Sequence, residues 1–273
     1  MNIWQADFYK YPLENQQNNE QWQLIICDQK GQIIYQVFCQ QKSANSSWLI
    51  TKLEPIIQQE KPHIIQVFRP QSLNLLTLVA NQLGVKVQAT RRTPQLKSIL
   101  KQQVSESYYN FLKIDQPPPQ AVPENLWGEK WQFVTFKGGD IIEFFKDRPI
   151  PIKDIPELLF PFKLGLASTT EIPGIIIYGS RTSMYLARWL GEIKPVSLNY
   201  IPTKINESGG LILEAGLVDR WILATFEDSE MAQAAQRYET QKQSSNGLHF
   251  LVVQPDDSGV TYSGFWLLRE EEF

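Results

Sequence analysis

Apolar positions divide the start of the chain into a series of strands. Residues 2–13 alternate between apolar and polar side chains, which is typical of a strand with one face against a core. Residues 22–28 and 32–39 are rich in β-branched and aromatic side chains, and the turn residues 29–31 between them predict a hairpin. The pattern therefore predicts three opening strands, of which the last two are antiparallel neighbours.

Helices and strands then alternate. We expect a helix over residues 44–60, interrupted by a proline, and short strands over 63–68 and 86–90. Apolar residues at helical spacing predict a helix over 72–83 between these strands, and Thr93-Pro94 opens a further helix. The predicted order is β-β-β-α-β-α-β-α, which is the element order of a ribonuclease H-like fold, although a shared fold confers no function.

A proline-rich segment predicts the boundary between two domains. Residues 116–123 contain a triple proline and a further proline, and such runs stiffen and extend a chain. We therefore expect a ribonuclease H-like N-terminal domain over residues 1–115, a linker over 116–123 and a second, mixed α/β domain over 124–273 that ends in a β-hairpin. The fold class of the whole chain is α+β, with α/β mixed in both domains.

The second domain is predicted to contain both strands and helices. A strand over 131–136 is bounded by Gly138-Gly139, and four prolines within 147–168 predict an extended, ordered loop. The further predicted elements are a strand over 174–179 that turns into a helix near Ser180, strands at 196–201 and on both sides of Val218-Asp219, a helix over 228–243 and a closing hairpin over 248–269.

Charge is distributed unevenly over the two predicted domains. Residues 1–115 hold 12 Lys and Arg against 8 Asp and Glu, whereas residues 116–273 hold 14 against 21. Residues 61–101 contain seven Lys and Arg and no acidic residue, in a chain whose net charge is −3. This local surplus indicates a surface suited to an anionic partner.

Three arginines follow two predicted strands that would be parallel neighbours. Arg69 follows the first strand, and Arg91 and Arg92 follow the second. Because ligands tend to lie beyond the carboxyl ends of parallel strands, we predict a phosphate-binding edge there. The alternative is that these arginines pair with carboxylates elsewhere. Lys97 belongs to the same basic stretch, and the candidates in the second domain are Arg181 and Arg188, which lie in the predicted helix after residue 179.

Residue types for metal or nucleophilic catalysis are sparse. His63 and His249 are the only histidines, and Cys27 and Cys39 lie on neighbouring predicted strands at positions that do not face each other. We therefore expect free thiols, no metal site, no catalytic residues and no cofactor. Residues 178–183 lack the glycine fingerprint of a nucleotide site.

Several stretches together resemble one family, the Tab/Atab family of photosystem translation and assembly factors. They are NIWQADFYKYPL (2–13), QVFRPQS (66–72), TRRTP (90–94), PPPQ (117–120), PENLWGE (123–129), WQF (131–133), DRPIPI (147–152), PFKLGLAST (161–169), LILEAGLVDRW (211–221), LATFED (223–228) and HFLVVQPDDSGVTYSGFWLLR (249–269). The resemblance implies binding of single-stranded A/U-rich RNA, with the ribosome or photosystem subunits as possible protein partners. It also implies that Trp266, Leu267 and Leu268 form a functional C-terminal motif.

Exposed aromatic residues would complete such an RNA site by stacking on unpaired bases. Tyr108, Tyr109 and Trp127 are the candidates, although burial is the favoured role of Trp127. No apolar run approaches the roughly 20 residues of a membrane-spanning helix, and the opening residues have no signal or transit pattern. We expect a cytoplasmic protein, with a peripheral position on thylakoid membranes as an alternative that the resemblance suggests.

Two rival functions make different predictions. A protein-interaction module that docks through its C-terminal sheet predicts an exposed apolar patch at Trp266. A metal-dependent ribonuclease predicts that Asp7, Asp28 and Glu54 share a metal position. The arginines that follow the predicted strands make the ribonuclease the least favoured of the three, because a basic edge stands where an acidic cluster is needed.

Overall fold

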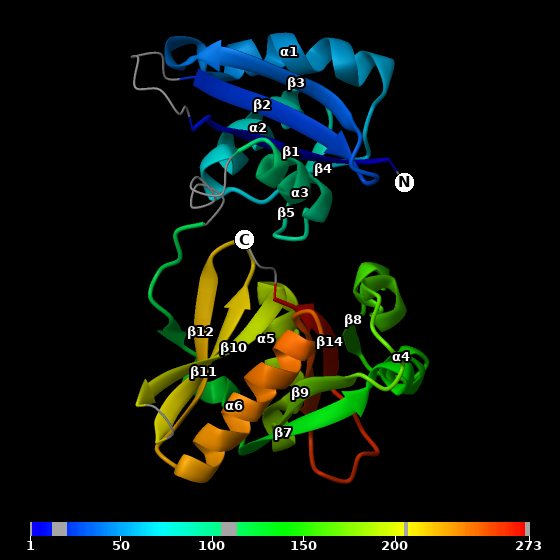
Figure 1. Ribbon diagram of the computed structural model, residues 1–273, viewed down its shortest axis with the longest axis vertical. Helices are drawn as coiled ribbons and strands as arrows, with labels where there is room; N and C mark the ends of the chain where they lie inside the picture. The colour runs from blue at the N-terminus through cyan, green and yellow to red at the C-terminus, as the bar shows by residue number, and fades with distance from the viewer. Residues whose placement is uncertain (1, 13–20, 105–113, 205–206, 271–273) are drawn as a thin grey trace. The chain divides into compact units, whose positions relative to one another are not determined.

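The computed structural model describes residues 2–12, 21–104, 114–204 and 207–270, which form two compact units (Figure 1). Unit 1 is Met1–Asp115 and unit 2 begins at Gln116. Each unit has its own sheets, helices and buried core, so each is described by itself. No helix within the described ranges is long and apolar enough to cross a membrane.

Unit 1 is built on one five-stranded sheet in the order β3-β2-β1-β4-β5 (Figure 1). The strands β1, β2 and β3 are antiparallel, whereas β4 and β5 run parallel to β1. Their bounds are Ile3–Lys10 (β1), Gln21–Asp28 (β2), Ile33–Gln40 (β3), Ile64–Val67 (β4) and Lys86–Ala89 (β5). The element order predicted from the sequence is thus the observed one.

Helices cover both faces of this sheet. The helices α1 (Ser46–Gln59) and α2 (Pro70–Gln82) pack their apolar faces against one side of the strands, and α3 (Pro94–Gln102) packs against the other. The side chain of Asn45 caps α1 by accepting a hydrogen bond from Trp48 N at 3.0 Å. Proline opens both α2 and α3, where its missing N–H costs nothing. Pro55 lies within α1 without ending it.

The two cysteines are free thiols on neighbouring strands and do not face each other. Cys27 pairs with Ile33 and Cys39 with Trp22. A register shift between Ile26 and Cys27 interrupts the ladder of β2 and β3, as a β-bulge does.

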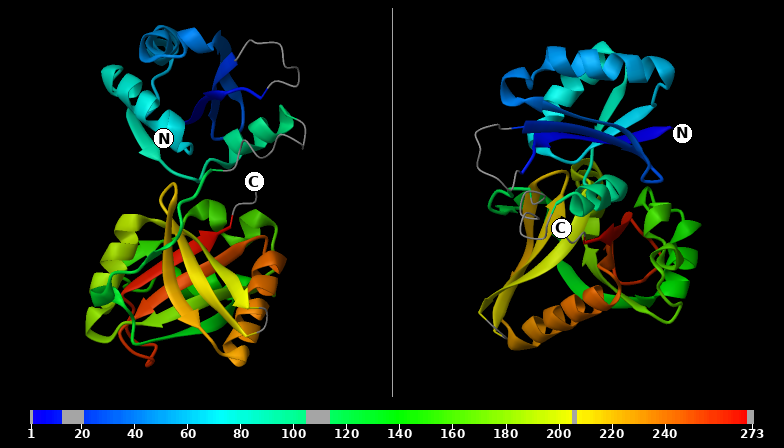
Figure 2. Two further views of the ribbon diagram at one scale, coloured as in Figure 1. Left: turned by 90° about the vertical axis from the view of Figure 1, so that its left-hand side faces the viewer. Right: turned by 45° about the horizontal axis from the view of Figure 1, so that its top comes forward.

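Unit 2 contains two sheets that enclose a common core. One sheet has the order β10-β11-β12-β6 and the other has the order β7-β9-β13-β14-β8 (Figure 2). The bounds are Gln120–Ala121 (β6), Lys130–Lys137 (β7), Ile152–Asp154 (β8), Glu171–Tyr178 (β9), Pro195–Lys204 (β10), Ser208–Ala215 (β11), Asp219–Phe226 (β12), Leu248–Gln254 (β13) and Gly264–Arg269 (β14). Leucines of β10 and β11 pack against apolar residues of β9, β13 and β14 between the sheets.

Three helices complete unit 2. They are α4 (Gly138–Lys146), α5 (Ser183–Ile193) and α6 (Ser229–Ser244), and short 3-10 helices lie at Glu124–Leu126 (η3), Glu157–Leu159 (η4), Pro161–Leu164 (η5) and Ser180–Thr182 (η6). The helix α5 contributes to the core between the sheets, whereas α4 packs on the outer face of the β7–β8 sheet. The predicted extended loop over 147–168 holds only the short strand β8 and two of these 3-10 helices.

The helix α4 was not expected, because the sequence begins it with two glycines. Gly138 N and Gly139 N donate to the carbonyls of Thr170 and Ser168. A Cβ on Gly138 would lie 3.2 Å from Ala167 O, and one on Gly139 would lie 3.0 Å from Ser168 Cβ. The two glycines therefore allow the start of α4 to pack closely against residues 167–170, and they do not mark a flexible end of the preceding strand.

The expected linker is partly a strand. Gln120 and Ala121 form β6, which pairs in parallel with Trp221 and Ile222 of β12. Part of the segment expected to be a linker, residues 116–123, thus contributes to a sheet. The prolines of this segment lie on both sides of the two paired residues, and β6 is an edge strand, where proline is tolerated.

Candidate functional site

The basic edge of unit 1 lies after two neighbouring parallel strands. Val67 at the end of β4 pairs with Ala89 at the end of β5, so Arg69 and Arg91-Arg92 follow the same edge of the sheet. Arg69 is the residue that precedes α2, and its backbone carbonyl accepts from Leu73 N. The topology therefore brings the three arginines to one end of the sheet.

Arg69 is engaged inside the protein. Its Nε lies 2.9 Å from Asp7 Oδ2 and 3.2 Å from Asp7 Oδ1, and Ser72 Oγ donates to Asp7 Oδ1 at 3.0 Å. Arg69 is 9% exposed and Asp7 is completely buried. Burial raises the pKa of the Asp7 carboxyl, and the Arg69 guanidinium acts in the opposite direction. The ion pair joins β1 to the start of α2.

Arg91 and Lys97 are also buried, and Lys97 Nζ donates to Arg91 O at 2.6 Å. Arg92 is partly exposed, and its backbone N–H donates to Thr90 Oγ1 at 3.1 Å. Two of the three arginines that follow the strands are thus buried, and for Arg69 the alternative of pairing with a carboxylate holds. Of the four cations predicted in unit 1, Arg92 is the one that is not buried.

The three carboxylates of the ribonuclease hypothesis have separate environments. Asp7 is bound by Arg69 and Ser72, and Asp28 Oδ1 accepts from the backbone N–H groups of Lys30 and Gln32 in the β2–β3 turn. Glu54 is exposed on α1. Within the described part of the chain, no group of three or more His, Cys, Asp or Glu side chains is placed to hold a metal ion.

Arg181 and Arg188 are both exposed, the first in η6 and the second in α5. Backbone N–H groups in the preceding turn are occupied, since Gly179 N donates to Gln254 O at 2.8 Å and Ser180 N donates to Pro255 O at 2.9 Å. The likeness of this turn to an anion-binding loop is correspondingly weak, because an anion would have to displace these carbonyls. The two arginine side chains remain accessible.

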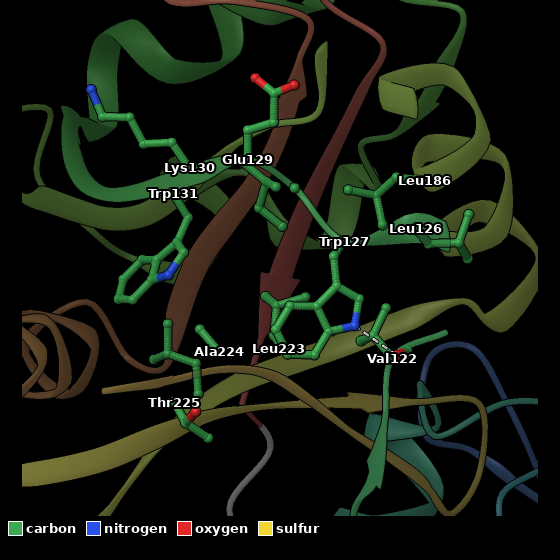
Figure 3. Close-up of a pocket in the computed structure, with 13 residues that line it drawn as sticks. Val122, Leu126, Trp127, Glu129, Lys130, Trp131, Leu186, Leu223, Ala224 and Thr225 are labelled. Atoms are coloured by element: carbon green, nitrogen blue, oxygen red, sulfur yellow. Dashed lines mark hydrogen bonds between the residues drawn. The ribbon is translucent and has the colours of Figure 1, made fainter. Parts of the chain in front are cut away.

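Trp127 is half exposed, so its favoured interpretation as a buried residue is wrong. The side chain is 51% exposed, and its Nε1 donates to Val122 O at 2.8 Å (Figure 3). The indole stands over a cavity of about 210 Å³ within unit 2, next to Trp131. The cavity is lined by Val122, Leu126, Trp127, Gly128, Glu129, Lys130, Trp131, Ile177, Leu186, Leu211, Leu223, Ala224 and Thr225. Tyr108 and Tyr109 lie outside the described residues.

The C-terminal motif lies in the core. Trp266 is 1% exposed, and both Leu267 and Leu268 are completely buried. Trp266 and Leu268 pack between the two sheets, whereas Leu267 packs against the α4 side. The Trp266 ring lies over Gly264, where a Cβ would be 2.3 Å from the ring. The exposed patch predicted by the docking hypothesis is therefore absent at these three residues.

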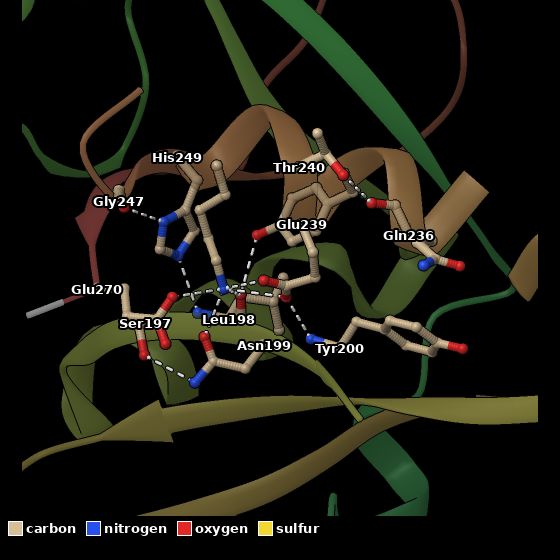
Figure 4. A network of polar contacts seen from close by, with 12 residues as sticks. Ser197, Leu198, Asn199, Tyr200, Gln236, Glu239, Thr240, Gly247, His249 and Glu270 are labelled. Atoms are coloured by element: carbon tan, nitrogen blue, oxygen red, sulfur yellow. Dashed lines mark hydrogen bonds and ion pairs between the residues drawn. The ribbon is translucent and has the colours of Figure 1, made fainter. Parts of the chain in front are cut away.

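A buried lysine organises a polar network that the sequence did not suggest (Figure 4). Lys242 Nζ lies 2.8 Å from Glu239 Oε2 and 2.9 Å from Glu270 Oε2, and it donates to Asn199 Oδ1 at 2.7 Å. The Lys242 side chain is 1% exposed. Glu270, the residue that follows β14, helps to neutralise this lysine. The network ties α6 to β10 and to the residue after β14.

His249 completes the network as a neutral imidazole. Its Nε2 accepts from Leu198 N at 2.8 Å, so the proton is on Nδ1, which donates to Gly247 O at 2.8 Å. Burial and the nearby Lys242 ammonium lower the pKa of His249 to about 3. A single histidine in a sequence gives no sign of such a role, because both partners are backbone groups.

Comparisons with known proteins cover almost the whole chain. A family model described as "RNA-binding protein Tab2/Atab2 N terminal" matches residues 3–103, and one described as "RNA-binding protein Tab2/Atab2, C-terminal domain" matches residues 109–269. A relative from Arabidopsis thaliana, "Protein TAB2 homolog, chloroplastic", is 28% identical over 287 residues, covering 97% of this chain and 74% of the relative. One of the same name from Zea mays is 26% identical over 284 residues, covering 98% and 71%.

Proposed function

The chain belongs to the Tab2/Atab2 family, and from this premise we propose that it binds single-stranded, A/U-rich RNA in the translation and assembly of photosystem reaction-centre subunits. The observation that carries the proposal is that both family models, which together span nearly all of the chain, are described as RNA-binding. The A/U preference, the photosystem role and possible contacts with the ribosome or photosystem subunits follow from the resemblance in sequence. The RNA-binding role is non-catalytic.

Accessible arginines are the groups that we propose to contact phosphates. Arg92 at the edge of unit 1, and Arg181 and Arg188 in unit 2, have exposed or partly exposed guanidinium groups. Arginine matches phosphate geometry and fixes the register of a nucleic acid without reading its sequence. Arg69 and its buried neighbours Arg91 and Lys97 have a structural role at this edge of the sheet.

The test is binding of an A/U-rich single-stranded RNA over a salt series. Three phosphate contacts with a single strand lower the slope of log K against log salt by about two. We therefore expect the variant Arg92→Ala/Arg181→Ala/Arg188→Ala to bind more weakly and with a slope reduced by about that amount. An unchanged slope would remove these arginines from the interface.

A charge-matched variant separates phosphate contact from a general loss of positive charge. Lys30→Ala/Lys137→Ala/Lys163→Ala removes three exposed cations, none of which we place at the interface. This control should keep the slope of the wild type. Absence of wild-type binding above that of a neutral protein would refute the RNA proposal for the isolated chain. If the wild type cleaves the RNA in the presence of Mg²⁺ and the variant Asp7→Asn does not, the ribonuclease hypothesis would instead be supported.

A further inference from the structure

The cavity beside Trp127 has a half-exposed indole at its wall, and a hydrogen bond fixes the orientation of that indole. Trp127 is a large aromatic residue with half of its surface exposed, yet its ring is held by the hydrogen bond from Nε1 to Val122 O. Here the orientation directs the ring toward the cavity, where Trp131 stands on the other side (Figure 3).

The chain that forms this wall is held by close packing. Glu129 N donates to Tyr178 O at 2.8 Å, and a Cβ on Gly128 would lie only 2.4 Å from Ile177 Cγ2. Only glycine at position 128 lets the segment between the two tryptophans lie this close to β9. The separation of Trp127 and Trp131 is therefore set by the fold before any ligand arrives.

The cavity has an apolar floor and a polar group at its margin. Leu186 of α5 and Leu211 of β11 belong to the floor, and Thr225 provides a hydroxyl at the lining. Glu129 and Lys130 also belong to the lining, but their exposed charged groups point away from the two tryptophan rings (Figure 3), and Lys130 Nζ lies 5.7 Å from the centre of the Tyr178 ring. Aromatic walls with a few hydrogen-bonding groups at the margin suit a flat heterocycle with polar edges.

The volume restricts the size of the ligand. About 210 Å³ is smaller than the roughly 300–1,000 Å³ of sites that enclose drug-sized ligands. A single ring system fits this space, and a whole nucleotide with its sugar and phosphate does not. The sugar and phosphate would stay outside, near the rim.

We propose that this cavity receives one unpaired base of the bound RNA, stacked on the indole of Trp127. The inference rests on the proposed RNA-binding function and names the part of the RNA that unit 2 holds. Stacking on a tryptophan requires no particular base because every base has a π-face. Thr225 is the group that would favour one base edge over another.

A nucleotide titration tests the cavity without relying on RNA. The full chain is labelled with 5-fluorotryptophan, and the ¹⁹F signals of Trp127 and Trp131 are assigned with the variants Trp127→Phe and Trp131→Phe. We expect uridine and adenosine monophosphates to shift the Trp127 signal in a saturable way, whereas inorganic phosphate leaves it in place. The buried Trp266 of the same unit provides an internal signal that should not move. If no nucleotide shifts the Trp127 signal, the inference is overturned. That result is also the one expected if the natural occupant of the cavity is an apolar side chain of a protein partner.

RNA binding by variants provides the second measurement. Stacking of one base on an aromatic side chain contributes about 5- to 150-fold in affinity, so Trp127→Leu should lose affinity in that range with an unchanged salt slope. Phe162→Leu is the matched control, because Phe162 is exposed in the same unit and does not line the cavity. Equal affinity of Trp127→Leu and the wild type for RNA overturns the inference and leaves RNA binding itself intact. Failure of the wild type to bind RNA overturns the proposed function, while the nucleotide titration still decides the cavity.

Discussion

Lys242 Nζ lies 2.9 Å from Glu270 Oε2, so a lysine buried in α6 is neutralised by the residue that follows β14. Glu239, three residues before Lys242 on α6, supplies the second carboxylate at 2.8 Å. A buried ammonium group requires such partners, because the loss of its hydration costs several kcal/mol. The ion pair therefore makes the end of the described chain part of the folded unit.

Removal of the lysine should destabilise unit 2 more than removal of its tail partner. Lys242→Ala leaves two carboxylates and the Asn199 side chain without their cation, and we expect a loss of about 3 kcal/mol in the free energy of unfolding. Glu270→Gln keeps the pair with Glu239, and Glu270 is partly exposed, so a loss of about 1 kcal/mol or less is expected. Urea unfolding of the full chain measures both, and equal losses would show that Glu270 carries the network.

Acid should weaken the fold through His249. Its pKa is lowered to about 3 in the folded state from an ordinary value near 6.5, so the unfolded state binds the proton first as the pH falls. The stability that the neutral imidazole contributes is complete above pH 6.5 and is lost between pH 6.5 and 3. The slope reaches about 1.4 kcal/mol per pH unit for one proton.

The comparison with His249→Gln isolates this group from all others that titrate. Glutamine has no proton to gain in this range, so the difference in unfolding free energy between wild type and variant should shrink as the pH falls from 7 to 4. Urea titrations at several pH values give this difference directly. Parallel curves for the two proteins would show that His249 does not titrate between the two states.

The pair of Arg69 and Asp7 should behave as a structural ion pair and not as a free phosphate ligand. Arg69→Met leaves the buried Asp7 carboxylate without its cation, and we expect unit 1 to lose about 3–5 kcal/mol. The double variant Asp7→Leu/Arg69→Met removes both charges and should recover most of that loss. Thermal unfolding, together with hydrogen exchange of the amides in β1 and β4, distinguishes the single variant from the double variant. A single variant as stable as the wild type would mean that Arg69 is available to a ligand.

The buried motif at the end of β14 makes a prediction about stability. Trp266→Ala should cost about 3–5 kcal/mol, because it leaves a large cavity between the two sheets. Trp127→Ala, at a half-exposed position, should cost far less. Near-UV circular dichroism and urea unfolding of both variants provide the measurement. A Trp266→Ala protein with wild-type stability that fails to bind a protein partner would restore the docking hypothesis.

Regular elements could be predicted from the sequence because their signals are local. Alternation in β1, the prolines that open α2 and α3, and the capping Asn45 each lie within a few residues of what they determine. The edge after β4 and β5 could also be located, since the order of elements implies which strands are neighbours.

The side-chain environments could not be predicted in the same way, because they depend on distant partners. Asp7, which engages Arg69, lies 62 positions earlier in the chain. The exposure of Trp127 depends on its bond to Val122 and on the shape of β9 and β12, while residue type alone favours burial. The role of the Gly138-Gly139 pair that opens α4 becomes clear only from its close contact with residues 167–170.

The position of β14 has a consequence for the synthesis of this protein on the ribosome. The strand lies between β13 and β8, and its side chains fill the cores on both faces of the sheet. Unit 2 therefore cannot close until translation has passed Arg269, whereas every strand of the unit 1 sheet has been made by Ala89. N-terminal domains commonly fold first during synthesis. A growing chain of this protein would thus carry a finished first unit while the second still exposes its unfilled core to chaperones.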